Sequence, residues 1–173
     1  MSCFLFLILS TVLLVSCSPG VSSLETSKIP TSNAIIGADE LRSFNATIKK
    51  SVYIPVYSNI LNYDKNVQIS LQALLSVRNT DQNRNLKISK ITYFDTNGKK
   101  IRDILKDSFY LKPLGSYEVV IKTSDLEGGS GAKFIVDWES DNLKIQNPLM
   151  EVIVTGFMNS TNISFSSRGV TLD

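Results

Sequence analysis

Histidine is absent from the chain, and its only two cysteines, Cys3 and Cys17, lie near the start. Without histidine there can be no Ser-His-Asp triad, no histidine metal site and no histidine acid–base catalysis. After residue 17 the chain also has no cysteine for a disulfide, a nucleophile or a zinc or iron–sulfur site. Any catalysis would have to use Ser, Thr, Tyr, Lys, Asp or Glu. We therefore expect a non-catalytic protein without a cofactor or bound metal.

A strong excess of one charge is also missing. The 18 basic and 16 acidic residues are interspersed and leave a net charge of +2, whereas nucleic-acid-binding domains concentrate positive charge on one face. We expect no nucleic-acid partner. The basic pairs Lys49-Lys50 and Lys99-Lys100 are interpreted as solvated residues, with contact to anionic lipid headgroups as the alternative.

The chain begins with an apolar run from Phe4 to Val15. This run is shorter than the ~20 apolar residues of a membrane-spanning helix, but it fits the core of a signal peptide, which has ~7–15 residues. It ends in Leu14-Val15-Ser16-Cys17, which resembles the lipobox of bacterial lipoproteins. In that motif a peptidase cuts before the cysteine, whose thiol carries diacylglycerol. We therefore predict a signal peptide at residues 1–16 and lipidation at Cys17, with acyl chains such as palmitate.

The same residues predict an exported protein that lipid holds on a membrane of the cell envelope. No Lys or Arg precedes the apolar run, so either the amino terminus alone supplies the positive charge of the leader or the true start lies upstream of Met1. Ser18 follows the cysteine. An aspartate at that place favours the inner membrane in Gram-negative lipoproteins, so we favour the outer membrane, with the protein facing the periplasm. A cleaved leader in which Cys17 has no role is the alternative.

Residues 17–44 are rich in Ser, Thr, Asn and Pro and show no sustained periodicity. We interpret them as the lipidated cysteine followed by a flexible tether, which would reach ~30 Å root-mean-square. Residues 38–42 could form a short helical turn within it.

From Ser51 onward the apolar residues recur with a period of two, and the segment from Val67 to Arg78 is the clearest case. Strict alternation over this length indicates a β-strand with one buried face. Leu74 is the single apolar residue in the polar phase. The apolar phase consists of Val67, Ile69, Leu71, Ala73, Leu75 and Val77.

Turn and bulge signals separate the other strands. The apolar phase slips after Ile88, which predicts a bulge near Ser89-Lys90. Asn97-Gly98 predicts a hairpin. Pro55 cannot donate to a ladder, so its strand should lie at a sheet edge or carry a bulge. Alternating runs lie at 52–57, 86–93, 101–105, 117–122, 134–139, 149–154 and 163–165.

About eight short strands separated by turns predict an all-β domain at residues 45–173. Because nearly every strand has one apolar face, we expect an immunoglobulin-like β-sandwich. A small β-barrel is the alternative fold.

Five ordered blocks carry a family resemblance: Tyr53–Ser58, Leu75–Asp81, Tyr93–Arg102, Gly128–Trp138 and Ile163–Gly169. Their order and spacing resemble a bacterial family known only as domain of unknown function 3124, which lipoproteins often carry. The resemblance extends over about residues 45 to 171. It supports the expected location and implies no activity, ligand or catalytic residue.

Two loop segments are candidate binding sites. Ser130 lies in the glycine-rich segment Gly128–Gly131, whose backbone N–H groups could bind an anion. A tight turn that needs a positive φ is the preferred interpretation. Asp95, together with Asn97, offers oxygen ligands near a turn, but the loop lacks the acidic series of a Ca²⁺ site and Asp95 more simply caps the turn.

Charged and aromatic residues on the strands provide further candidates. Arg78 and Arg168 each end a well-patterned strand, and at the same end of a sandwich they could bind a carboxylate or phosphate. The alternative is a structural ion pair, for instance Arg78 with Asp81. Tyr53 and Tyr57 share one face of their strand, which suits either a protein or glycan partner or packing in the core.

These features leave three hypotheses for function. The first is a lipid-tethered, non-enzymatic module that binds an envelope protein or glycan through its loops and edge strand. The second is a hydrolase of envelope glycans that uses paired carboxylates, although Asp137 and Glu139 more simply mark a solvent face beside Trp138. The third is a lectin-like or Ca²⁺-dependent binder. The hydrolase hypothesis draws on Asp95, Asp137, Glu139 and Glu151.

Overall fold

A computed structural model of the chain describes residues 33–37, 44–61, 67–158, and 161–172. These residues form twelve strands in two antiparallel sheets. Among them no helix is long and apolar enough to cross a membrane. The predicted signal peptide, Cys17 and the helical turn at 38–42 lie outside the described residues.

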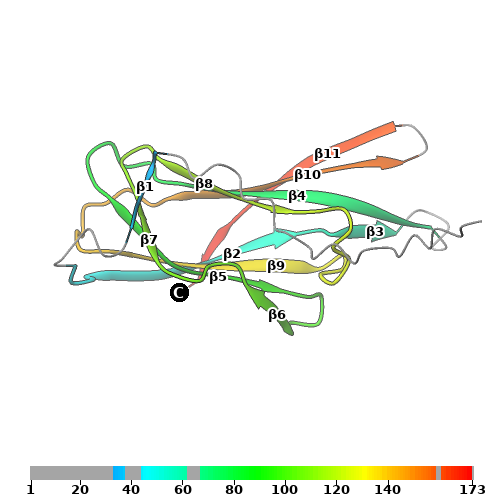
Figure 1. Cartoon of the computed structure of the whole chain (residues 1–173), viewed down its shortest axis with the longest axis horizontal. Helices are drawn as coiled ribbons and strands as arrows, with labels where there is room; N and C mark the ends of the chain where they lie inside the picture. The colour runs from blue at the N-terminus through cyan, green and yellow to red at the C-terminus, as the bar shows by residue number, and fades with distance from the viewer. Residues whose placement is uncertain (1–32, 38–43, 62–66, 159–160, 173) are drawn as a thin grey trace, which may run out of the picture.

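The two sheets lie face to face (Figure 1). In the first, the strand order is β1-β7-β5-β9-β2-β12, and β6 pairs with β5 beside β7. In the second, the order is β11-β10-β4-β3, and β8 pairs with β4 beside β3. The first sheet contains β1 (Ile35–Gly37), β7 (Phe109–Leu111), β5 (Leu86–Phe94), β9 (Ala132–Ser140), β2 (Ile48–Val56), β12 (Val170–Leu172) and β6 (Lys100–Asp103). The second contains β11 (Thr161–Arg168), β10 (Leu149–Met158), β4 (Gln68–Arg78), β3 (Asn59–Leu61) and β8 (Ser116–Ile121).

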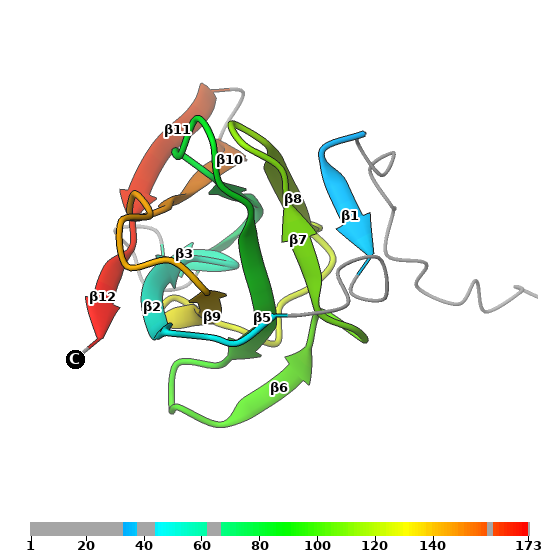
Figure 2. The ribbon, with the colours of Figure 1, turned by 90° about the vertical axis from the view of Figure 1, so that its left-hand side faces the viewer.

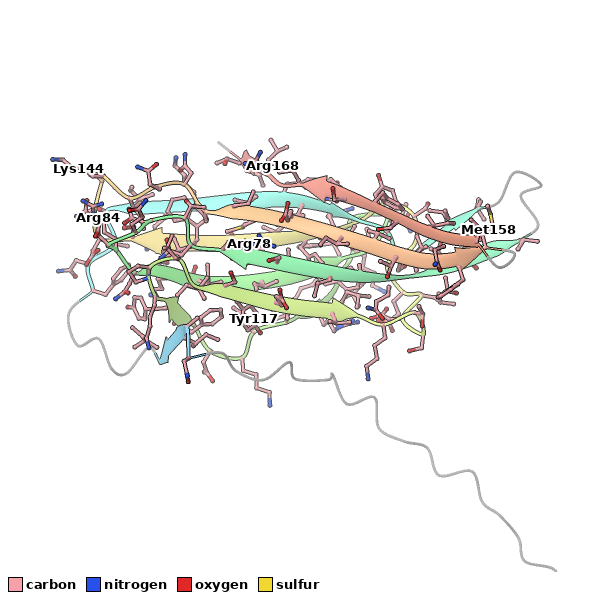
Figure 3. All side chains as sticks on the ribbon, turned by 90° about the horizontal axis from the view of Figure 1, so that it is seen from above. Arg78, Arg84, Tyr117, Lys144, Met158 and Arg168 are labelled. Atoms are coloured by element: carbon pink, nitrogen blue, oxygen red, sulfur yellow. The ribbon has the colours of Figure 1, made fainter. Side chains whose placement is uncertain are left out.

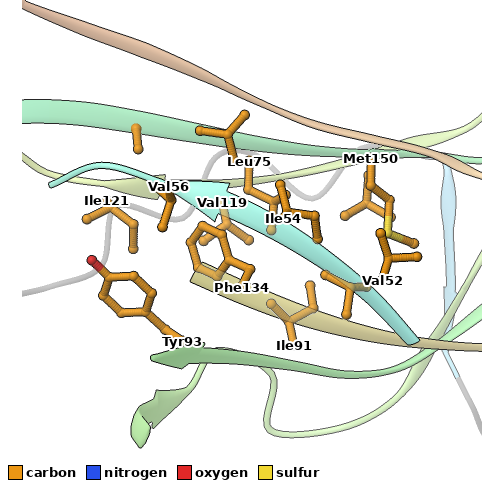
Figure 4. Packing of buried hydrophobic residues seen from close by; sticks show 14 of the residues in the cluster. Val52, Ile54, Val56, Leu75, Ile91, Tyr93, Val119, Ile121, Phe134 and Met150 are labelled. Atoms are coloured by element: carbon orange, nitrogen blue, oxygen red, sulfur yellow. The ribbon is translucent and has the colours of Figure 1, made fainter. Parts of the chain in front are cut away.

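One hydrophobic core fills the space between the sheets, as the sequence alternation predicts. Successive residues of a strand point to opposite faces, so every second side chain enters the core. In β9 the inward residues are Phe134, Val136 and Trp138, which are almost fully buried. They face inward residues of β4 and β10 such as Leu75 and Met150 (Figure 4). This burial is the main favourable contribution to folding.

The predicted β-sandwich is confirmed, and neither sheet closes into a barrel within the described residues. The twelve strands exceed the predicted eight because four of them have only three residues. A period of two cannot be recognised over three residues. One of these short strands, β1, pairs with β7 although it lies in the segment interpreted as tether. Packing against the sheet therefore begins before residue 45, the predicted start of the domain.

The pairing between strands confirms two of the predicted local features, the bulge and the hairpin. The register between β5 and β9 shifts between Ile88 and Lys90, which confirms the bulge. The hairpin is confirmed, with Gly98 at a φ of 82°. Pro55 lies in a strand that is flanked by both β9 and β12, but β12 pairs only with residues 51–53. The predicted edge or bulge is therefore wrong for the strand as a whole, because β2 has a neighbour on each side and no register shift. Pro55 stays opposite Lys133 of β9 but lies beyond the stretch that β12 pairs, so its missing N–H breaks no bond to β12.

The two flanks of the sandwich differ. On one flank the chain crosses from β11 in the second sheet to β12 in the first (Figure 2). The crossing is held because the Gly169 N–H donates to Met150 O at 2.9 Å and the Ser167 hydroxyl donates to Pro55 O at 2.6 Å. On the opposite flank β6 and β8 lie at the margins of different sheets, and no described strand joins them. The second flank is therefore open.

Candidate functional site

The open flank contains a cavity of about 330 Å³ between β6 and β8. Its floor is apolar, because Val119 and Ile121 of β8 are almost fully buried there and Ile104 lies beside them. Its rim is charged and comes from the end of β6 and from the loop after β8. The cavity is lined by Arg102, Ile104, Val119, Val120, Ile121, Lys122, Ser124, Asp125, Leu126 and Glu127.

Arg102 organises the rim. Its guanidinium donates to the carboxylates of Asp125 and Glu127, the latter at 3.2 Å. It also lies over the ring of Tyr93, 5.1 Å from the centroid, at a distance typical of a cation–π contact. These contacts fix the loop after β8 against β6. Both carboxylates bind the Arg102 guanidinium, so they are its ion-pair partners rather than a separated general acid and general base.

Tyr93 lies beneath Arg102 and is fully buried. Burial, reinforced by the charge of Asp125, raises the pKa of its hydroxyl to about 12, although the Ser58 hydroxyl and Arg102 oppose this rise. The hydroxyl makes no well-formed hydrogen bond with the part of the chain that is described. At neutral pH Tyr93 is therefore uncharged and is not a nucleophile, and its ring belongs to the core that lies beneath Arg102.

A second polar cluster ties together the loops at one end of the sandwich. Figure 2 views the ribbon from this end. Asn79, directly after β4, is buried, and its side chain makes four hydrogen bonds. Its amide nitrogen donates to the carbonyls of Arg84 at 2.7 Å, Leu111 at 3.1 Å and Lys112 at 3.0 Å. Its amide oxygen accepts from the Asp81 N–H at 3.0 Å. One side chain thus joins the loop after β4 to the loop between β7 and β8.

Asp81 extends this cluster to a third loop. Its carboxylate accepts from the N–H groups of Asn83 and Arg84 at 2.8 and 2.9 Å, and from the Gln146 N–H at 3.1 Å. The Arg84 guanidinium completes the set at 3.2 Å. The backbone bond from Asn83 is the main cause that lowers the pKa of Asp81, and burial partly opposes it. The carboxylate therefore stays ionised, and its role is structural.

Asn79 and Asp81 were not predicted as a site from the sequence. Asn and Asp directly after a strand are typical turn formers that bond to nearby backbone groups. That signal was present in Asn79-Thr80-Asp81. Their bonds to Leu111, Lys112 and Gln146 could not be read from it, because those partners are distant in sequence.

Arg78 and Arg168 lie on the same outer face of the second sheet, on β4 and β11 with β10 between them (Figure 3). Arg78 forms an ion pair with Glu151 at 3.4 Å, and Arg168 lies opposite Glu151 in the register of β10 and β11. The suggested pair of Arg78 with Asp81 is wrong, since Asp81 binds Arg84 instead. Both arginines thus flank the carboxylate of Glu151, which belongs to the protein itself.

The two tyrosines have different surroundings. Tyr57 is half-buried and packs edge-on against Phe165, with ring centroids 5.4 Å apart, at the flank where the chain crosses. Tyr53 is also half-buried and lies on the outer face of the first sheet between its cross-strand neighbours Ile135 and Val170. They do not form one joint aromatic surface.

Asp95 and Ser130 lie in neighbouring turns at the end opposite the Asn79 cluster. Asp95 accepts hydrogen bonds from the N–H groups of Asn97 and Lys99, as expected of a turn cap. Ser130 is exposed. The N–H groups on either side of it are already used, because Gly129 donates to Ser58 at 2.8 Å and Gly131 donates to Thr96 at 2.9 Å. With Gly129 at a φ of 77°, the segment has the geometry of a tight turn.

The carboxylates on β9 point outward, as their spacing predicts. Asp137 accepts from the Ser51 hydroxyl at 2.6 Å, and Glu139 pairs with Lys87 at 3.0 Å. Trp138 between them is buried in the core. Among the described residues no three acidic, histidine or cysteine side chains gather as a metal site would require.

The fold and the cavity define an all-β sandwich with one open flank. The chain belongs to the family described as "Protein of unknown function (DUF3124)", whose model matches residues 49–172. The resemblance seen in the five sequence blocks is thereby confirmed. Comparison with curated proteins gives no match, and comparison with solved structures gives none either.

Proposed function

We propose that this chain is a lipid-anchored, non-enzymatic binding module of the cell envelope, and that its ligand or partner binds at the cavity on the open flank. The observation that carries the proposal is the composition of this cavity, an apolar floor under a rim of fixed charges. Binding pockets combine apolar walls with a few placed polar groups in this way. Its volume suits a small ligand or one or two side chains of a partner.

The placement of the other carboxylates supports binding rather than hydrolysis. Asp95 caps a turn, Asp137 and Glu139 lie on the outer face of the first sheet, and Glu151 lies on the outer face of the second. A glycosidase needs two carboxyl groups that face each other across the substrate at ~5–9.5 Å. Asp95 and Glu151 belong to separate surfaces. Asp137 and Glu139 share one face, but they lie side by side on one strand and are bound to Ser51 and Lys87, so they do not face each other across a substrate.

The anchor is tested by replacing its thiol. For Cys17→Ala we expect loss of the protein from the membrane fraction, because no thiol remains for diacylglycerol and two or more acyl chains are what make anchoring stable. Metabolic labelling with a palmitate analogue should mark the parent protein and leave the variant unlabelled. Cys3→Ala is the matched control and should remain membrane-bound and labelled. A Cys17→Ala protein that is still acylated would overturn the anchor.

The cavity is tested by photo-crosslinking in intact cells. A photoreactive residue at Leu126, which is on the rim and 45% exposed, should give a discrete adduct on denaturing gels. The same residue at Val170, 64% exposed on the opposite flank, is the control and should give none. Identical adducts at both positions, or none at Leu126, would contradict binding at this flank. Arg102→Ala should weaken the Leu126 adduct, because the rim loses the cation that fixes Asp125 and Glu127.

A further inference from the structure

The end of the sandwich that is tied by Asn79 and Asp81, here called the loop end, exposes two leucines. It consists of the loops at residues 79–85, 112–115 and 141–148. Leu143 is 76% exposed and Leu114 is 66% exposed. Lys144 directly follows Leu143, and Lys112 lies two residues before Leu114. Both lysines are exposed. Paired apolar and basic residues at loop tips are suited to the boundary between lipid headgroups and acyl chains.

The backbone of Leu114 has a defined conformation that a hydrogen bond fixes. Leu114 is the single described residue other than glycine with a positive φ, 57°, a region that residues with a side chain seldom adopt. Its N–H donates to Asp81 O at 3.0 Å, so the Asn79–Asp81 cluster fixes its backbone. Strained backbone of this kind is concentrated at functional sites. Here it presents an apolar side chain to the surroundings of the loop end.

The same end carries an excess of positive charge. Arg84 and Lys87 are neutralised by Asp81 and Glu139. The four exposed lysines at or near this end then outnumber its exposed carboxylates in the described residues, which are Asp141 in the loops and Glu118 near the start of β8. These lysines are Lys49, Lys50, Lys112 and Lys144. Anionic lipid attracts such a cluster over about one Debye length, ~8–10 Å at physiological salt.

The amino-terminal chain joins the domain at this end. The Lys112 N–H donates to Ala34 O at 2.9 Å, and the Lys112 ammonium donates to Asn33 O at 2.7 Å. Only 16 Cα–Cα steps (33 − 17) lead from Cys17 to Asn33. A flexible chain of that length spans ~22 Å root-mean-square, less than the ~36 Å length of an eleven-residue strand such as β4. A lipid on Cys17 would therefore keep the loop end, and not the opposite end, near the bilayer.

We propose that the loop end is a membrane-contacting surface, in which Leu114 and Leu143 enter the headgroup region of an anionic bilayer and the lysines bind its phosphate groups. This inference rests on the lipid anchor of the proposed function and adds an orientation to it. The sandwich stands on the membrane on its loop end, and the open flank faces sideways along the surface.

Environment-sensitive fluorophores on single cysteines test this orientation. The acylated full chain, with Leu143→Cys, is reconstituted into vesicles of phosphatidylethanolamine and phosphatidylglycerol and labelled there. The new thiol is the sole reactive one, because Cys3 leaves with the signal peptide and Cys17 is acylated. We expect a blue-shifted emission and at least twofold quenching by nitroxide lipids. Phe157→Cys, at the far end and 76% exposed in the parent, is the matched control and should behave as in water.

The outcomes separate the two proposals. A protein that floats with the vesicles but has equal emission at both positions, or stronger quenching at Phe157→Cys, overturns the contact surface and leaves the anchor intact. A protein that does not float overturns the anchor and the orientation with it. Replacing two lysines of the loop end, Lys49→Gln with Lys144→Gln, should at least halve the quenching at Leu143→Cys. The control is Lys99→Gln with Lys106→Gln, which changes the charge equally elsewhere and should leave the quenching unchanged.

Discussion

Asn79→Ala should lower the free energy of unfolding by about 3 kcal/mol, because four hydrogen bonds are lost in a buried place where water cannot replace them all. The carbonyls of Leu111 and Lys112 would lose the amide that now satisfies them. For a domain of this size such a loss corresponds to a fall in Tm of about 10 °C. Urea or thermal unfolding of the purified protein, followed by circular dichroism, measures it.

Thr80→Ala is the matched control for this prediction. Thr80 is the next residue, is exposed, and its hydroxyl donates one hydrogen bond to Asn147 O at 2.8 Å. An exposed hydrogen bond of this kind contributes little, so the loss should stay below about 1 kcal/mol. Equal effects of the two substitutions would mean that the Asn79 amide does not hold the loops together. A destabilised loop end in Asn79→Ala should also lose part of the fluorophore quenching at Leu143→Cys.

The sheets could be predicted from the sequence because burial imposes a short, local period. Val67 to Arg78 alternates so regularly that β4 and its inward face follow directly. Leu74, the exception in that run, is also explained by the sheet. It lies on the outer face between its cross-strand neighbours Val120 and Ile153. These three apolar residues shield one another, an arrangement that depends on pairing between strands distant in sequence.

The candidate sites could be predicted only in part, and the reason is again distance along the chain. Asp95 was assigned to a turn cap because its partners, Asn97 and Lys99, are close in sequence. The rim of the cavity was not predicted, because Arg102 meets Asp125 and Glu127 only after β6 and β8 have been placed on facing sheets. The charge pattern of one segment does not show which residues of a distant segment will contact it.

Gly128→Ala should destabilise the domain by about 3 kcal/mol, the upper part of the range for forcing extra atoms into a packed interior. A Cβ at Gly128 would overlap the hydroxyl oxygen of Tyr93 and would lie 2.8 Å from both Tyr93 Cζ and Ala132 Cβ. The Tyr93 ring cannot retreat, because it packs on Phe134 with ring centroids 5.1 Å apart. Gly131→Ala, in the same loop, is the control. The nearest atom to its Cβ would be the Thr96 Cγ2, at 3.1 Å, with the Thr96 Cα at 3.6 Å, and the cost should be below about 1 kcal/mol.

A second substitution identifies Tyr93 as the cause of that loss. Tyr93→Phe removes a hydroxyl that makes no well-formed hydrogen bond in the described structure, so alone it should change stability by less than about 1 kcal/mol. In the Tyr93→Phe background, Gly128→Ala should cost at least about 1 kcal/mol less than in the parent, because the closest overlap has gone while that with Cζ remains. Chemical denaturation of the four proteins gives this coupling energy. If the two losses simply add, the close approach of Gly128 to the Tyr93 hydroxyl is not the cause of the lost stability.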